Sequence, residues 1–148
     1  MKKRILALLM CATMVFGLVA CGGGSSDEGA NNDGAAEKIK VGLVTDVGGV
    51  NDGSFNQSAW EGLQKAAADF DIEVKYLESK GDADYTPNIE TFVDEEYDLI
   101  ICVGYMLAAA TMEAAQTYPD QQFAIIDDAT CADLPNVTCL MFKQEQAS

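Results

Sequence analysis

The chain has no histidine among its 148 residues, and this absence excludes several kinds of catalytic and metal site. Ser-His-Asp and Cys-His catalysis need an imidazole base, and many zinc sites use histidine ligands. Basic residues are also scarce, since nine Lys and Arg stand against 24 Asp and Glu. The resulting net charge of −15 repels phosphate backbones, so nucleic-acid binding is disfavoured.

Phosphate and metal motifs are missing as well. Gly48, Gly49 and Gly53 do not form the G-x-G-x-x-G pattern, and no P-loop lysine follows them. Asp82 and Asp84 are too few for a calcium loop. We therefore expect neither a metal nor another cofactor.

The first 37 residues are predicted to be a targeting and anchoring segment. A basic start precedes the apolar run Ile5–Val19, which is short for a bilayer span and ends in Leu18-Val19-Ala20-Cys21. This ending is similar to a bacterial lipobox, which implies a signal peptide over residues 1–20 and palmitate or a related lipid on Cys21. The alternative is an ordinary secretory signal cleaved near Ala20.

The composition after Cys21 favours the lipid anchor. Residues 22–36 contain almost no apolar mass, so residues 21–37 are predicted to be a flexible tether. Cleavage before Cys21 removes three basic residues and no acid, which leaves 6 basic against 24 acidic residues, or −18. We expect the chain to be anchored to the extracytoplasmic face of the cell membrane without spanning it.

Apolar runs and amphipathic stretches alternate from residue 38 onward, which predicts a mainly parallel sheet in a three-layer α/β unit. The expected strand order is 2-1-3-4-5, with right-handed crossovers. Residues 38–148 are long enough for one such unit. Strands are expected at Ile39–Asp46, Ile72–Glu78, Leu99–Gly104, Phe123–Asp127 and Val137–Phe142, and helices at Phe55–Asp71, around Pro87–Glu95, and at Met106–Thr117.

Polar and aromatic residues follow several of these strands. In a parallel sheet the carboxyl ends meet at one edge, which is where open α/β sheets bind ligands. Carboxylates accept hydrogen bonds from ribose hydroxyls or ring N–H groups, a carboxamide both donates and accepts, an aromatic ring stacks, and glycine permits close approach. The candidate ligand-binding residues are Asp46, Phe55, Asn56, Gly104, Tyr105 and Asp127.

Purely structural roles are open for several residues near these positions. Asp52-Gly53 is typical of a turn, Ser54 of a helix N-cap, and Trp60 of a core residue. Cys131 and Cys139 flank a turn and could form a disulfide outside the cytosol or remain free thiols.

Specific motifs resemble the BMP family of bacterial substrate-binding lipoproteins, the purine-nucleoside receptors of ABC importers. The likeness runs from about Ile39 to the final residue and is carried by SFNQSAWEGL, DLIICVGY, YPDQQFAIID and LPNVTCLMFKQEQAS. It implies a two-lobed type I periplasmic-binding-protein architecture, of which this sequence is expected to be an incomplete first lobe. It also implies ABC permease and ATPase subunits as partners.

The resemblance implies roles for the candidate residues. Asp46, Phe55 and Asn56 correspond to purine contacts, and Asp127 corresponds to a ribose contact. Tyr105 matches an aromatic position after the third-strand glycine, and Gly53 stands where relatives often have lysine.

Other functions remain open at this point. The same fold could bind a sugar or another small polar metabolite, or the chain could be a surface interaction module without a small ligand. An enzyme that uses Asp46 and Asp127 as catalytic carboxylates is less favoured, since histidine, a phosphate loop and a metal cluster are all missing from the sequence.

Overall fold

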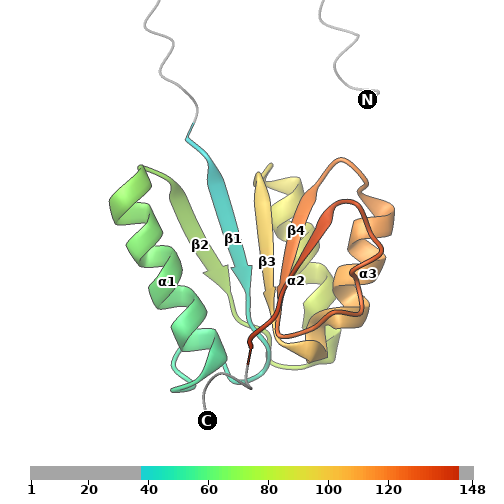
Figure 1. The fold of residues 1–148 in the computed structure, drawn as a ribbon, viewed down its shortest axis with the longest axis horizontal. Coiled ribbons are helices and arrows are strands. Elements are labelled where there is room, and N and C mark those ends of the chain that lie inside the picture. Colours follow the sequence, from blue (N-terminus) through green and yellow to red (C-terminus); the bar gives the residue numbers. More distant parts are fainter. Residues whose placement is uncertain (1–37, 144–148) are drawn as a thin grey trace, which may run out of the picture. The chain divides into compact units, whose positions relative to one another are not determined.

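A computed structural model describes residues 38–143, which fold into an α/β unit of three layers (Figure 1). The strands are β1 (Lys40–Val44), β2 (Glu73–Leu77), β3 (Leu99–Val103), β4 (Gln122–Ile126) and β5 (Val137–Leu140). The α-helices are α1 (Phe55–Phe70), α2 (Tyr85–Asp94) and α3 (Ala108–Thr117), and the 3-10 turns η1 (Asp82–Asp84) and η2 (Tyr105–Leu107) precede the last two helices. The expected elements are present with slightly shifted ends.

The five strands form one parallel sheet in the order β2-β1-β3-β4-β5, which confirms the topology expected from the sequence. Because every pairing is parallel, all the strands end at the same edge, the lower one in Figure 1. The strand order reverses direction between the neighbours β1 and β3, and ligands bind at such switch points in sheets of this kind.

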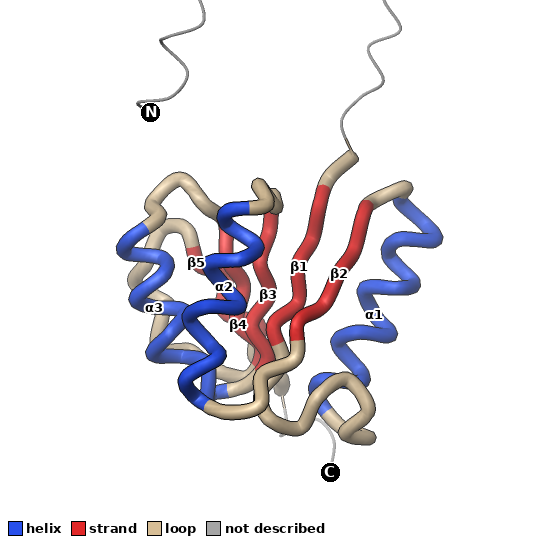
Figure 2. The backbone as a smooth tube through the Cα atoms, turned by 180° about the vertical axis from the view of Figure 1, so that it is seen from behind, coloured by secondary structure: helices blue, strands red, loops and turns tan. Residues whose placement is uncertain are grey.

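Helices cover both faces of the sheet. Seen from behind in Figure 2, α2 and α3 lie over β3 and β4, while α1 runs along β2. The core on the α2–α3 side includes Ile89, Phe92, Ile100, Phe123 and Ile125, all essentially inaccessible to solvent. A smaller core under α1 joins Leu63 to residues of β1 and β3, and Trp60 packs against it only partly buried. Alternate strand residues therefore serve the two cores.

The Phe92 ring of α2 packs directly over Gly42 in β1. A Cβ atom at Gly42 would lie 2.7 Å from the Phe92 ring, well inside contact distance. We expect Gly42→Ala to lower the free energy of unfolding by about 1–3 kcal/mol, because the ring has to move out of a packed core.

Gly62, inside α1, is the matched control for this substitution. A Cβ at Gly62 meets nothing within 4 Å, so Gly62→Ala should stabilise the protein by about 0.5–1 kcal/mol through helix propensity alone. Urea unfolding followed by circular dichroism measures both. Equal effects of the two substitutions would contradict the close contact between Gly42 and Phe92.

The three cysteines within the described residues are free thiols. Burial raises the pKa of Cys102 to about 12, so this thiol stays protonated and behaves as a small apolar side chain. Cys131 is also buried, and its Sγ lies 3.6 Å from the Ala108 carbonyl oxygen. Of the two states that the sequence left open for Cys131 and Cys139, this structure has the reduced one.

The predicted signal peptide, Cys21 and the predicted tether lie outside the described residues. Between residues 38 and 143, no helix has the length and apolar character needed to cross a membrane.

Candidate functional site

The end of β1 and the start of α1 are joined through a carboxylate and a carboxamide. Asn56 Nδ2 donates a hydrogen bond of 2.7 Å to Asp46 Oδ1, and the backbone N–H of Gly48 donates one of 2.8 Å to the same oxygen. Gly48 is confined here, since a Cβ at this position would lie 3.1 Å from Asp46 Oδ1 and 3.2 Å from Asn56 Nδ2. The structure thus brings together two of the residues singled out in the sequence.

Asp52 caps α1, where the sequence predicted only a turn. Its Oδ1 accepts the backbone N–H groups of Ser54 (2.8 Å) and Gln57 (3.0 Å), and its Oδ2 accepts the N–H of Asn56 at 3.2 Å. The N–H groups of Asn56 and Gln57 belong to the first turn of α1 and need acceptors, while Ser54 precedes the helix. Ser54 occupies the N-cap position as predicted, but its side chain makes no capping hydrogen bond.

The same N–H groups stabilise the ionised form of the Asp52 carboxylate. Burial alone would raise its pKa, but the hydrogen bonds from Gln57, Ser54 and Asn56 outweigh burial, and the pKa lies below the ordinary 3.8. Because the pKa is lowered on folding, this group stabilises the protein above pH 3.8, and the contribution is lost as the pH falls through the lowered pKa.

This gives a prediction for Asp52. Asp52→Ala should cost about 0.5–2 kcal/mol at neutral pH, the usual range for losing an N-cap acceptor. Asp52→Asn keeps an acceptor and should cost less at neutral pH, and its difference from the unchanged protein should shrink as the pH falls below 3.8. Denaturant unfolding across this pH range measures both. A difference between Asp52→Asn and the unchanged protein that is independent of pH would contradict the role of the charge.

The loop between Asp46 and α1 is also held from β2. Glu78 Oε1, just after β2, accepts the backbone N–H of Val50 at 2.9 Å. Gly49 has φ +67°, and a Cβ there would lie 2.7 Å from the same Glu78 oxygen. The loop therefore has fixed contacts at Gly48, Val50 and Asp52.

Asn56 is buried, at 1% exposed, and its Oδ1 has no hydrogen-bond partner among the described residues. Its Nδ2 donates twice, to Asp46 Oδ1 and to Asp52 Oδ2 at 3.0 Å. The sequence suggested that this carboxamide offers a ligand both a donor and an acceptor. In the structure the donors are already engaged, and only the acceptor remains.

The residues after β3 lie at the same edge. Gly104 has φ +89°, and a Cβ there would lie 3.8 Å from Asp46 Oδ2, so this glycine faces the carboxylate. Its N–H donates to the Ile126 carbonyl and is not free for a ligand. Tyr105 follows in η2 and is 73% exposed, which leaves its ring available for contacts.

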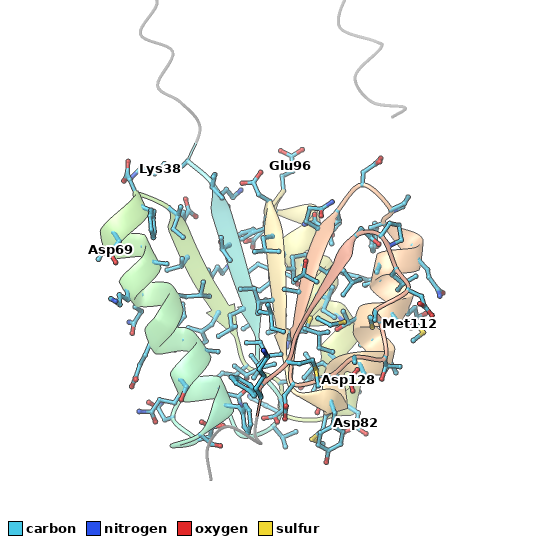
Figure 3. The ribbon with its side chains drawn as sticks, viewed as in Figure 1. Lys38, Asp69, Asp82, Glu96, Met112 and Asp128 are labelled. Atoms are coloured by element: carbon cyan, nitrogen blue, oxygen red, sulfur yellow. The ribbon has the colours of Figure 1, made fainter. Side chains whose placement is uncertain are left out.

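The residues after β4 have different tasks. Asp127 is partly buried, has φ +62°, and its N–H donates to the Leu140 carbonyl of β5 at 2.9 Å. Asp128 Oδ1 accepts the N–H of Thr130 at 2.7 Å, a local turn contact. Figure 3 labels Asp128 and Asp82 near the edge where the strands end, and Lys38 and Glu96 near the opposite edge.

A cavity of about 580 Å³ opens between the beginning of α1 and the end of β4. Of the six predicted ligand residues, only Phe55 lines it. The Phe55 ring is 44% exposed and meets the Phe142 ring edge to face, with centroids 5.7 Å apart. The segment after β5 returns to this edge in Figure 1, which explains the contact. The lining residues are Ser54, Phe55, Ser58, Ala59, Ile126 and Phe142.

Sequence reasoning missed Phe142 and Tyr85 as members of this region. Tyr85 begins α2, is 4% exposed, and its hydroxyl has no partner among the described residues. Burial and then the nearby carboxylates of Asp82 and Asp46 raise its pKa, so the hydroxyl keeps its proton. The available signal was an aromatic residue with a polar tip at a helix start on the strand-end side of the sheet.

The comparison with known protein families identifies the family of this chain. The family model Bmp, described as "ABC transporter substrate-binding protein PnrA-like", matches residues 39–148. The chain belongs to the Bmp family. Proteins of that description bind substrates for ABC transporters and are not enzymes.

Relatives agree with the Bmp assignment. The chain is 44% identical to the CD4+ T-cell-stimulating antigen of Listeria innocua, with 100% of this chain and 43% of that protein covered. It is 34% identical to the ABC transporter nucleoside-binding protein BmpA of Lactococcus lactis, with the same coverage of 100% and 43%. It is 33% identical to a lipoprotein of Pyrococcus furiosus, with 100% and 36% covered. The chain thus spans well under half the length of these relatives.

A solved structure shares the fold of this Bmp chain. The crystallised solute-binding protein of an ABC transporter system from Aeropyrum pernix K1 has 32% identity and a TM-score of 0.66. The match covers 72% of this chain and 29% of that one. The parallel sheet and its helices therefore match part of that solute-binding protein.

Proposed function

We propose that this chain forms part of a membrane-anchored substrate-binding protein of an ABC importer, and that its ligand is a purine nucleoside. The single observation that carries the proposal is the bonded pair of Asp46 and Asn56 next to Phe55 at the carboxyl edge of a parallel sheet. Membership of the Bmp family and the nucleoside-binding relative support it.

The chemistry of the edge suits a base attached to a sugar. Phe55 presents an exposed ring on which a heterocycle can stack, and stacking of this kind contributes about 0.5–1.5 kcal/mol beyond the buried area. Asp46 supplies a carboxylate for ring N–H groups, and we assign Asp127 to the ribose hydroxyls. The cavity of about 580 Å³ lies within the range of small-molecule sites, roughly 300–1,000 Å³.

The remaining residues receive supporting roles in this proposal. Gly104 leaves room for a ligand beside Asp46, and Tyr105 offers a second aromatic surface. Phe142 forms the other wall of the cavity.

We further propose how the protein is placed in the cell. Residues 1–20 act as a lipoprotein signal peptide, Cys21 carries the lipid, and residues 21–37 tether the folded lobe of residues 38–148. The lobe then faces the extracytoplasmic side, where it delivers its ligand to the permease, while the ATPase subunits drive import. The relative named as a lipoprotein is consistent with this arrangement.

Ligand binding tests the assignment directly. Calorimetric titration with guanosine, inosine and adenosine, alongside ribose and glucose, is carried out on the complete product of the gene. We expect saturable binding of the nucleosides and none of the free sugars. Binding of sugars alone would overturn the nucleoside assignment while leaving the solute-binding role in place.

A further inference from the structure

The connection between β4 and β5 runs back along α3 (Figure 1). Because the two strands are parallel, the chain has to return from the carboxyl edge to the opposite edge before β5 begins. Cys131 lies near the carboxyl edge, since its Sγ is 3.6 Å from the carbonyl oxygen of Ala108 at the start of α3. Asn136 lies at the other end of α3, where its Nδ2 donates to the carbonyl oxygens of Tyr118 and Gln121.

The strand β5 then brings Cys139 back toward Cys131. This strand runs toward the carboxyl edge, and Cys139 is in register with Ile125 near the end of β4. The Cys139 side chain packs against the core on the α2–α3 side, which is also the side on which Cys131 contacts α3. The two cysteines therefore lie on adjoining segments that run in opposite directions, near the same edge and on the same side of the sheet.

Burial gives the three thiols different chemical properties. Cys102 is 0% exposed in β3, and burial raises its pKa to about 12, so it stays protonated. Ile125 separates Cys102 from Cys139 in the strand register. Cys131 is 1% exposed, and burial and then the nearby Cys139 raise its pKa. Cys139 is only partly buried and lies in the last strand of the described sheet, so a reagent in solution can reach this thiol.

We propose that Cys131 and Cys139 form a disulfide when the protein meets a small-molecule disulfide such as oxidised glutathione, and that Cys102 takes no part. This inference goes beyond the proposed function and does not depend on it. The bond ties β5 to the connection that precedes it and closes the loop of residues 131–139. A disulfide of this kind is expected to persist outside the cytosol.

The oxidation proceeds by two exchange steps. The Cys139 thiolate attacks one sulfur of glutathione disulfide, forms a mixed disulfide and releases one glutathione thiolate. Cys131 then loses its proton to solvent, and its thiolate attacks the Cys139 sulfur and releases the second glutathione thiolate. The two protein thiols are oxidised by two electrons, and glutathione disulfide is reduced to two molecules of glutathione. The second step is intramolecular, because both thiols belong to one folded segment.

Peptide mapping of the complete product of the gene tests the pairing. The protein is reduced, exposed to glutathione disulfide, alkylated in denaturant, and digested with a protease that cleaves before aspartate. Asp120 and Asp133 lie between the three cysteines, so each cysteine falls on a separate peptide. We expect the Cys131 and Cys139 peptides to be joined and the Cys102 peptide to be alkylated. A bond between Cys131 and Cys102, glutathione retained on Cys139, or three alkylated thiols would overturn the inference.

Thermal unfolding with and without reductant gives a second measurement. A disulfide lowers the conformational entropy of the unfolded chain, so reductant should lower the melting temperature of the oxidised protein by about 5 °C or more. Cys139→Ser should show no such shift and no joined peptides. Cys102→Ala is the matched control and should keep both. An equal response to reductant in the unchanged protein and in Cys139→Ser contradicts the pairing. If Cys102→Ala does not fold, the peptide map of the unchanged protein decides.

Discussion

Asp46→Ala is expected to reduce nucleoside affinity by about a hundredfold or more. The substitution removes the carboxylate that we propose accepts the ligand's N–H group, and hydrogen bonds to charged groups contribute about 1.5–3 kcal/mol each. It also releases Asn56 Nδ2, which loses its 2.7 Å bond to Asp46 and no longer has both donors engaged. Two contacts are thus affected, and about 2.7 kcal/mol corresponds to a factor of a hundred.

Calorimetric titration measures this loss against a matched control at the same edge. Asp128→Ala also removes a carboxylate, but the contact of Asp128 is with the N–H of Thr130 in its own turn. We expect Asp128→Ala to bind nucleosides almost normally. Asp46→Asn keeps the size of the side chain and removes only its charge. This variant therefore separates a loss of affinity from a loss of folding. Normal affinity in a folded Asp46→Ala protein would remove Asp46 from the site.

Cys21→Ser is expected to abolish lipid attachment completely. A thioether-linked lipid can attach only to the sulfur atom of Cys21. A serine hydroxyl does not replace this sulfur in lipoprotein processing. The lipid on Cys21 supplies the membrane affinity of the predicted anchor. Loss of this modification therefore also removes the anchor.

Incorporation of a labelled fatty acid measures this directly, since uncleaved apolar sequence could hold the variant at the membrane without a lipid. The label should be present in the unchanged protein and absent from Cys21→Ser. Cys11→Ser is the matched control, because Cys11 lies inside the predicted signal peptide and should be lost with it. Label retained in Cys21→Ser, or lost in Cys11→Ser, would contradict the predicted anchor at residue 21.

The fold could be predicted from sequence because its elements are locally encoded. Continuous apolar runs within β1 (after Lys40) and in Leu99–Val103 favour burial on both faces, which is the condition of a central parallel strand. Alternation of such strands with amphipathic segments then restricts the topology to a few arrangements. Helix ends were less predictable: α2 begins at Tyr85, before Pro87, and the segment from Tyr105 starts as a 3-10 turn.

The meeting of Asp46 and Asn56 could be predicted, because polar residues that follow parallel strands lie at one edge of the sheet. Asp46 and Asn56 are ten positions apart in the sequence and are joined by a hydrogen bond in the structure. The capping role of Asp52 was missed, since an Asp-Gly pair is equally typical of a simple turn. Phe142 was assigned to the fifth strand, and its contact with Phe55 depends on how the chain turns after Leu140.

What the sequence determined by itself is therefore the family, the parallel order of the strands and the set of chemical groups at their carboxyl ends. The strand order and the chemical groups follow from hydrophobic patterning and from residue types, and the family follows from the motifs that resemble it. Only the tertiary structure decided that the carboxamide of Asn56 has no donor left to offer. That property depends on two carboxylates converging on one nitrogen from β1 and from the loop before α1, and hydrogen-bond direction exists only once those atoms are in place.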